Sequence, residues 1–319
     1  MQNKCLGVFL VLTAIPLVML SIFVLGTGKI TSIKYYKELF KKSNSYELAI
    51  RALPKTEEKT SENGNVISII STKATPTWLE TNITKNLDQF DAYINNRSNT
   101  LDPSIDIGIF KNDFASQLPT EMQEIVPSTI SFSTYTEYLN NANQLITNTI
   151  KSIPGSNQDN IIEINKQIDS TKHTQQQFTQ NANSIKTGFF YAKIISYIIF
   201  ALTLLMLLII AIAARHYVPA IFRWTGQTLF ISGLLTLIMT LLTQYIVKNY
   251  NFLAPLKISA EIKQLITPLY NNVLNDITTA TIKISFLVTI IGLISVIFSY
   301  ILPMMMPKLI KPISPPVKT

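Results

Sequence analysis

The sequence has one cysteine, Cys5, and two histidines, His173 and His216, among 319 residues. A single cysteine excludes a disulfide framework and any metal site built from cysteines. Neither histidine has a cysteine, a second histidine or a carboxylate at the spacing of metal ligands. The sequence therefore predicts no metal site that includes these residues.

Three aspartates come closest to a calcium-binding pattern: Asp102, Asp106 and Asp113. The spacing of an EF-hand loop and its closing glutamate are missing, so we expect structural or solvent-exposed roles for these carboxylates. Glycine is scarce, with 10 residues in the chain, and the glycine-rich loop that binds phosphates is absent. No Gly-x-Ser-x-Gly nucleophile motif occurs either. These gaps predict a protein that is not an enzyme and carries no cofactor.

Long uncharged runs dominate what the sequence does contain. Residues 194–214 are 21 positions without a charge, and 13 of them are Leu, Ile or Phe. An α-helix needs about 20 such residues to cross the hydrocarbon core of a bilayer. These large apolar side chains contribute about −4 to −8 kcal/mol to the free energy of insertion into a membrane. This run and residues 225–247 after it predict a transmembrane helical hairpin.

Two further runs bring the number of predicted spans to four. Residues 5–26 are expected to form an uncleaved signal-anchor, because the run is too long for a secretory signal and no small-x-small cleavage site follows. Residues 284–302 are expected to form the last span, closed by Pro303. The predicted fold class is therefore mainly α, an integral membrane protein with four transmembrane helices and a helical extracytoplasmic domain between spans 1 and 2. The predicted boundaries are 1–26 for transmembrane helix 1, 27–187 for the extracytoplasmic domain, 188–214 for helix 2, 215–224 for a cytoplasmic turn, 225–247 for helix 3, 248–283 for an amphipathic extracytoplasmic loop, 284–302 for helix 4 and 303–319 for a cytoplasmic tail rich in Pro and Lys.

The last two spans each carry small side chains at spacings of three and four residues, which places them on one helix face. On the third span these are Thr228, Ser232, Thr236, Thr240 and Thr243, and on the fourth they are Ser285, Thr289, Gly292, Ser295 and Ser299. Small residues mark faces at which membrane helices pack closely, so we predict that the two stripes meet. A Ser/Thr stripe can also line a water-filled path. Packing is favoured because no ionisable residue sits inside any span, and ion or proton paths usually need one.

Arg215, Arg223 and Trp224 flank the predicted turn between the second and third spans. We interpret them as membrane-interface anchors, because amphipathic rings and cations favour the headgroup region. With the termini inside, the inner face holds six Lys and Arg and no Asp or Glu, whereas the count of lysines close to the span ends favours the reverse orientation. Long loops translocate largely regardless of charge, so we expect cytoplasmic termini in a bacterial cytoplasmic membrane.

The net charge of +8 belongs to the flanks of the spans, because residues 27–187 contain 16 Lys/Arg and 17 Asp/Glu. Cations in such flanks meet anionic lipid headgroups. The expected partners are therefore the lipid bilayer and a protein partner or a second copy of the chain. Nucleic acid is not expected.

Apolar spacing within residues 27–187 predicts helices at 30–42, 46–53, 76–94, 110–118 and 135–153, with a short strand at 66–70 and an extended segment at 101–109. A heptad seam from Ile161 to Phe189 runs directly into the second span. This segment either couples the domain mechanically to the hairpin or serves as a stiff stalk. In the loop at 248–283, Pro268 is expected to divide an amphipathic helix in two.

Four groups of residues resemble those of uncharacterised bacterial four-span membrane proteins with a helical extracytoplasmic domain after the first span. The groups are Tyr36-Lys37-Glu38-Leu39 with Tyr46, Trp78-Leu79 with Leu87 and Tyr93-Ile94, Ile105-Asp106-Ile107 with Phe110-Lys111, and Phe222-Arg223-Trp224-Thr225-Gly226 with Leu229 and Ser232-Gly233. The resemblance implies a layout and a location, and it carries no activity.

Two functions are consistent with this sequence. The first is a non-enzymatic bacterial membrane protein whose outer helical domain binds or braces envelope or partner components. The second is an oligomeric transporter or channel subunit lined by the Thr/Ser face of the third span. The first is favoured because the outer domain is large, while the predicted cytoplasmic segments are too short to form an effector domain.

Overall fold

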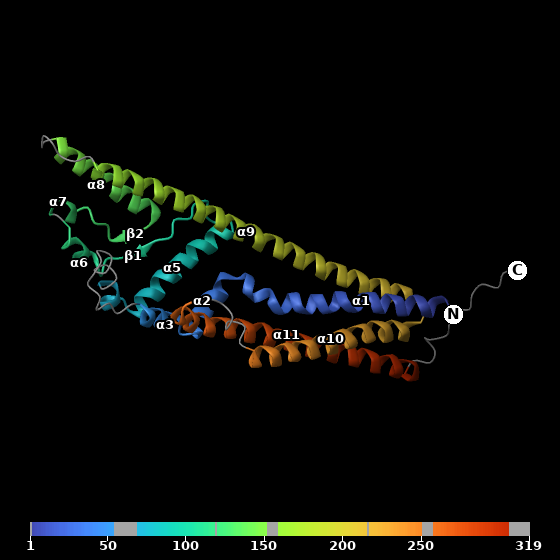
Figure 1. Cartoon of the computed structure of the whole chain (residues 1–319). Coiled ribbons are helices and arrows are strands. Elements are labelled where there is room, and N and C mark those ends of the chain that lie inside the picture. The colour runs from blue at the N-terminus through green and yellow to red at the C-terminus, as the bar shows by residue number, and fades with distance from the viewer. Residues whose placement is uncertain are drawn as a thin grey trace. The chain divides into compact units, whose positions relative to one another are not determined.

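The computed structural model describes residues 2–53, 69–118, 120–151, 159–215, 217–250 and 258–305. This part of the chain is mainly helical, as the sequence predicts (Figure 1). The chain divides into two compact units. One unit, the apolar bundle, comprises Met1–Ser32, Phe190–Lys257 and Tyr270–Thr319, and the other, the helical domain, comprises Ile33–Phe189 and Ile258–Leu269.

The apolar bundle is built from α1 (Gln2–Thr27), the second half of α9 (Asp159–Ala213), α10 (Val218–Asn249) and most of α11 (Ala260–Met305). Four helices of the described chain are long and apolar enough to cross a membrane: Gly7–Thr31, Ile162–Ala213, Val218–Asn249 and Ile262–Met305. Their outward-facing Leu, Ile, Phe and Met side chains are largely exposed. An exposed apolar surface of this extent is unfavourable in water and favourable in a bilayer. The prediction of four candidate spans is thus confirmed.

Two helix breaks predicted around the last span, at Pro268 and at Pro303, are wrong. Helix α11 runs unbroken from Ala260 through Pro268 to Met305, so Pro268 does not divide the segment and Pro303 lies inside the helix. A proline removes its own backbone hydrogen bond and crowds the carbonyl four residues earlier. Thr267 beside it donates its hydroxyl to Lys263 O at 2.6 Å, so this turn keeps a side-chain bond to the helix backbone. The helix stays continuous on both sides of Pro268, supported by the long apolar helix that follows. Residues 260–283 therefore belong to the same helix as the predicted fourth span.

A 3-10 turn (Gly28–Thr31) follows α1 at the end of the bundle's first segment, and the helical domain begins with α2 (Ile33–Lys42) and α3 (Ser45–Ala52). Helix α5 (Pro76–Ile94) comes next, and Thr75 caps it by accepting Trp78 N at 3.1 Å. The remaining elements are β1 (Ile105–Asp106), α6 (Lys111–Ala115), α7 (Thr120–Gln123), β2 (Thr129–Ile130), α8 (Phe132–Lys151) and the first half of α9. Helices α2, α3, α5, α6 and α8 match the predicted helices to within a few residues, and β1 lies in the predicted extended segment, whereas α7 and β2 were not predicted. The predicted strand at 66–70 is wrong for Ile69 and Ile70, which are helical, and its other positions lie outside the described residues.

Two small apolar clusters form the core of the helical domain. Ala74, Ile107 and Phe110 form the first, and Phe110 meets Trp78 edge to face at 5.1 Å between ring centroids. The second joins α5 to α9. It consists of Tyr93, Leu101 and Ala182, with Phe90 and Phe178 packed against them.

Helix α9 is continuous from Asp159 to Ala213, so the heptad segment and the second span are parts of one helix, as the pattern predicts. Most seam positions that the structure describes face inward: Ile168 and Ala182 are buried and Phe178 is half-buried. Ile185 is an exception, being exposed. The seam therefore packs within the helical domain over most of its length.

Candidate functional site

Three side chains on one face of α5 hold the extended segment that contains β1. Asn86 accepts Ser104 N at 2.8 Å and donates to Ser104 O at 2.9 Å, and Asn82 accepts Asp106 N at 2.6 Å. Trp78 Nε1 donates to Asp106 O at 2.7 Å. Residues four apart on a helix lie above one another, so their polar groups follow the segment like a neighbouring strand. On its other edge, β1 pairs with β2 in antiparallel register, Ile105 opposite Ile130.

Asp102 fixes the start of α8 to the same segment. Its carboxylate accepts Phe132 N at 3.0 Å and the Ser131 hydroxyl at 2.8 Å, and it also accepts the Ser133 hydroxyl. An anion at a helix N-terminus satisfies free N–H groups and interacts favourably with the helix dipole. Asp106 accepts Gly108 N at 2.8 Å, and Asp113 pairs with Lys73. The three aspartates thus take part in separate contacts.

Replacing Asp102 with alanine is expected to destabilise the helical domain by about 1–2 kcal/mol, because the first turn of α8 loses its anionic acceptor. Thermal unfolding of the full chain measures the change, and amide exchange at the start of α8 locates it. Asp88→Ala is the matched control, since Asp88 forms only an exposed pair with Lys37 and such pairs contribute less than about 1 kcal/mol. Equal melting of the two variants would show that Asp102 does not fix α8.

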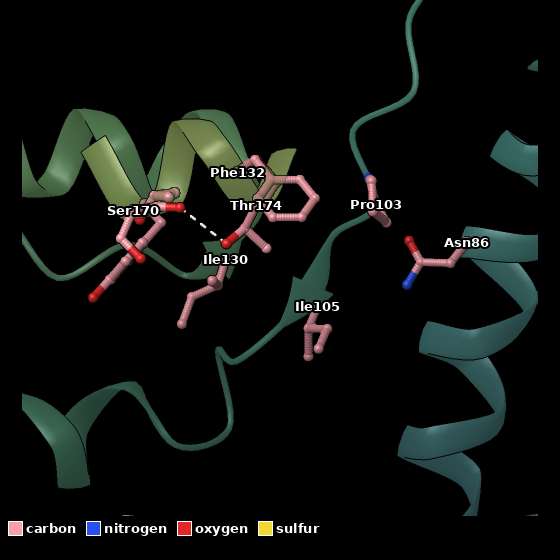
Figure 2. Close-up of a pocket in the computed structure, with 10 residues that line it drawn as sticks. Asn86, Pro103, Ile105, Ile130, Phe132, Ser170 and Thr174 are labelled. Atoms are coloured by element: carbon pink, nitrogen blue, oxygen red, sulfur yellow. Dashed lines mark hydrogen bonds between the residues drawn. The ribbon is translucent and has the colours of Figure 1, made fainter. Parts of the chain in front are cut away.

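Between these elements lies a groove of about 430 Å³. The residues that line it come from five elements, α5 (Asn86), β1 (Ile105), β2 (Ile130), the start of α8 (Phe132) and α9 (Ser170 and Thr174) (Figure 2). We call it the β1–α9 groove, and its lining residues are Asn86, Pro103, Ile105, Ile130, Ser131, Phe132, Tyr135, Ser170, Thr171 and Thr174. The volume is within the range of pockets that bind small organic ligands.

None of the ten lining side chains carries a charge. The apolar contribution comes from Ile105, Ile130 and Phe132, while several hydroxyls and the Asn86 amide supply polar groups at the edge. Burial, with a smaller contribution from Tyr135 beside it, raises the pKa of the Tyr138 phenol, so this neighbour also stays neutral. The groove can hold an uncharged and mostly apolar group, and the lining that the structure describes contains no cation to neutralise a phosphate or a carboxylate.

The predicted packing stripe on α10 is buried at one end and exposed at the other. Thr228, Ser232 and Thr236 are buried, Thr240 is half-buried and Thr243 is exposed. Each of the five hydroxyls donates to the carbonyl one turn earlier, at 2.6 to 2.9 Å. Ser232 also lies 3.3 Å from Ile15 O of α1. Hydroxyls that bond their own helix leave no unsatisfied polar group in an apolar environment.

The stripe on α11 approaches α10 most closely at three glycines, Gly226 and Gly233 of α10 and Gly292 of α11. A methyl group built on Gly233 would lie 2.5 Å from Thr289 Oγ1, and one built on Gly226 would lie 2.9 Å from Ser295 Cβ. At Gly292 the backbones themselves approach, since an added methyl would lie 2.3 Å from Phe230 N. Ser285 and Ser299 are buried as well. This geometry favours close helix packing over an aqueous lining.

The three predicted anchors lie in different surroundings. Arg215 and Arg223 are exposed, and the Arg223 guanidinium lies 5.7 Å from the centroid of the Tyr300 ring. Trp224 is half-buried, because its ring packs on Gly7, where an added methyl would lie 2.3 Å from it. His216, in the same turn, lies outside the described residues. Trp224 thus joins α10 to α1 in addition to any contact with lipid.

Sequence reasoning missed several contacts that the structure contains. Gly226 and Gly233 were not assigned to the packing face of the third span, although glycine in a span is a signal of close approach. The Ser21 and Thr203 hydroxyls lie 2.7 Å apart and join α1 to α9. No signal in the sequence pairs two residues so far apart along the chain.

In the described part of the chain, no group of three or more His, Cys, Asp or Glu side chains could hold a metal ion. No protein-family model, curated protein or solved structure matches the chain. The resemblance to bacterial four-span proteins therefore stays an expectation, and a function has to be inferred from the geometry of the chain itself.

Proposed function

We propose that this chain is a multi-pass protein of a bacterial cytoplasmic membrane whose helical domain is an extracytoplasmic, non-enzymatic binding module. The β1–α9 groove would take an uncharged, mostly apolar group of an envelope component or a partner protein. The observation that carries the proposal is the combination of volume and chemistry in this groove: about 430 Å³ lined by ten side chains without a charge. A bulky apolar group gains about 25 cal/mol for each Å² removed from water there.

Two features of the groove support a binding role over a simple packing defect. Ile105 and Ile130 are 46% and 37% exposed, although both belong to the paired strands. Exposed isoleucines beside a rim of hydroxyls are typical of a surface that a partner covers. The groove is also bounded by α9, the helix that continues into the second span.

Photo-crosslinking in intact cells tests the groove directly. A benzoylphenylalanine residue at position 105 or 130 is expected to form one discrete adduct. The matched control is position 109, where Ile109 is 50% exposed and does not line the groove. Equal adducts at all three positions, or none at positions 105 and 130, would contradict the proposal.

The change Ile130→Glu is expected to reduce the adduct at position 105 at least about tenfold, because a carboxylate in an uncharged groove must be desolvated when the ligand binds. Ile109→Glu should leave that adduct within about twofold of the unmodified chain, since a surface substitution outside a site has little effect. Immunoblotting of the adduct measures both. Similar losses in the two variants would mean that the adduct forms outside the groove.

The proposed orientation has its own test. In a Cys5→Ser background, cysteine replaces Asn99, an exposed residue of the helical domain, or Arg215, an exposed residue at the end of α9. A membrane-impermeant maleimide should label position 99 in intact cells and position 215 only after permeabilisation. The reverse pattern would place the helical domain in the cytoplasm.

A further inference from the structure

A second cavity lies within the apolar bundle, at the end where α10 begins and α11 ends. Its volume is about 500 Å³, and it is lined by residues of α1, α10 and α11 together with Tyr217 just before α10. Those that matter here are Val8, Arg223, Trp224, Gln227, Ser299 and Tyr300. We call this cavity the Arg223 pocket. Unlike the β1–α9 groove, it combines a cation with aromatic and aliphatic walls.

Among the described residues, no Asp or Glu forms an ion pair with Arg223. The sequence contains no Asp or Glu before Glu38, between Asp169 and Glu261, or after Asp276. Asp276 lies on α11, but at 1.5 Å per residue it is about 36 Å along the helix from Tyr300. The anion that neutralises this cation is therefore not an Asp or Glu side chain of the described bundle.

The structure orients Arg223 for such an anion. The guanidinium lies 5.7 Å from the Tyr300 ring centroid, a distance at which the ring quadrupole attracts the cation. A guanidinium carries five N–H donors in a planar fork that matches the oxygens of a phosphate. Trp224, packed on Gly7, forms the adjacent wall.

The pocket extends from this cation toward apolar surface. Val8 lines it, and Val8, Phe9 and Leu12 on the same stretch of α1 are each at least 60% exposed. A ligand that fills the pocket would therefore join an anionic group to an aliphatic chain. This combination distinguishes a phospholipid from a free phosphate.

We propose that the Arg223 pocket binds an anionic phospholipid of the surrounding bilayer. The phosphate accepts hydrogen bonds from Arg223, and an acyl chain lies along Val8 and Trp224. Pockets of this kind between membrane helices, with basic side chains at headgroup depth, select anionic headgroups. The inference requires that the bundle crosses a membrane, and it is independent of what the helical domain binds.

The full chain, purified in mild detergent and freed of lipid, is titrated with phosphatidylglycerol or phosphatidylcholine, and native mass spectrometry measures the bound fraction. Phosphatidylglycerol is expected to bind about tenfold more tightly, the effect of one charge-assisted contact. Arg223→Gln should bring the two lipids to within about twofold of each other. Arg215→Gln, which removes an exposed arginine outside the pocket, is the matched control and should keep most of the preference.

Three outcomes would overturn the proposal. They are equal binding of the two lipids by the unmodified chain, equal loss of preference in the two arginine variants, and displacement of the lipid by glycerol phosphate, which would indicate a site for a soluble phosphate. If Arg223→Gln does not fold, Tyr300→Leu takes its place. This change removes the ring that lies against Arg223, and Tyr300 is itself exposed, so the substitution disturbs little packing. Flotation of the unmodified chain with liposomes checks membrane insertion separately, so a failure of the membrane assignment is distinguishable from a failure of the lipid site.

Discussion

Gly292→Ala is expected to destabilise the apolar bundle by about 2–3 kcal/mol, the upper part of the range for overpacked cores. The added methyl would lie 2.3 Å from Phe230 N, 2.7 Å from Phe230 Cα and 2.8 Å from Gly226 O. All three atoms belong to the backbone of α10, so no side-chain rotation can relieve the overlap. The two helices must separate, and the close van der Waals contact on which packing in a bilayer depends is then lost.

Thermal unfolding of the full chain in mild detergent measures this loss. Trp224 fluorescence in a Trp78→Phe background reports on the bundle, because Trp224 packs between α10 and α1. Gly188→Ala is the matched control: Gly188 also lies inside a helix, and an added methyl there meets nothing within 4 Å. Alanine in a helix interior is favoured over glycine by about 0.8–1.0 kcal/mol, so the control should melt at or above the temperature of the unmodified chain. A Gly292→Ala bundle that melts like the control would show that α10 and α11 are not in close contact there.

Two buried hydroxyls on α11 lead to a contrasting expectation. Thr281 Oγ1 and Ser285 Oγ are buried and have no hydrogen-bond partner in the described structure. Ser285 therefore contributes no side-chain hydrogen bond in the described structure, and its backbone oxygen is the atom close to Gly233, 3.0 Å from where an added methyl would lie. Along this stripe the glycine positions set how closely α10 and α11 approach.

The candidate spans were predictable because one quantity decides them, the length of an uncharged apolar run. A run such as residues 194–214 is long enough and apolar enough for a helix to cross the hydrocarbon core of a bilayer. The ends of the helices were less predictable. Composition changes near Lys248 and near Lys283, but the backbone bonds of α10 continue to Asn249 and those of α11 begin at Ala260. Helix propagation adds one bond per residue, so a polar turn beyond a stable span still extends it.

The two cavities could not be predicted from the sequence. The β1–α9 groove brings Asn86, Ile130 and Thr174 together, and no periodic pattern relates positions so far apart. At the Arg223 pocket the sequence indicates only that Arg223 and Trp224 are interface anchors, not that they line a cavity. The remaining wall is formed by Val8 of α1 and Tyr300 of α11. Which face each of these helices turns toward Arg223 depends on how the helices pack, and the sequence does not specify that rotation.

Asn82→Ala is expected to destabilise the helical domain by about 2 kcal/mol, because a buried N–H group left without an acceptor costs about 1–3 kcal/mol. Asn82 is 4% exposed, and its amide accepts Asp106 N at 2.6 Å while it donates to Trp78 O at 3.0 Å. The next backbone N–H group, that of Ile107, donates instead to Ser128 O at 2.8 Å, in the segment just before β2. Alternate N–H groups of an extended strand point to opposite sides, so β2 cannot satisfy Asp106 N when the asparagine is removed.

Hydrogen–deuterium exchange of peptides that cover residues 104–107 is the direct measurement, and thermal unfolding of the full chain gives the magnitude. Asn95→Ala is the matched control: Asn95 is exposed, and its amide bonds only Asp91 within the same helix end. Exchange at Asp106 should be faster in Asn82→Ala by at least about tenfold, as expected for a loss of more than 1.4 kcal/mol, and unchanged in Asn95→Ala. Unchanged exchange in both would mean that α5 does not hold the segment. Because Ile105 lies in this segment, faster exchange should be accompanied by weaker crosslinking from position 105 and by no change at position 109.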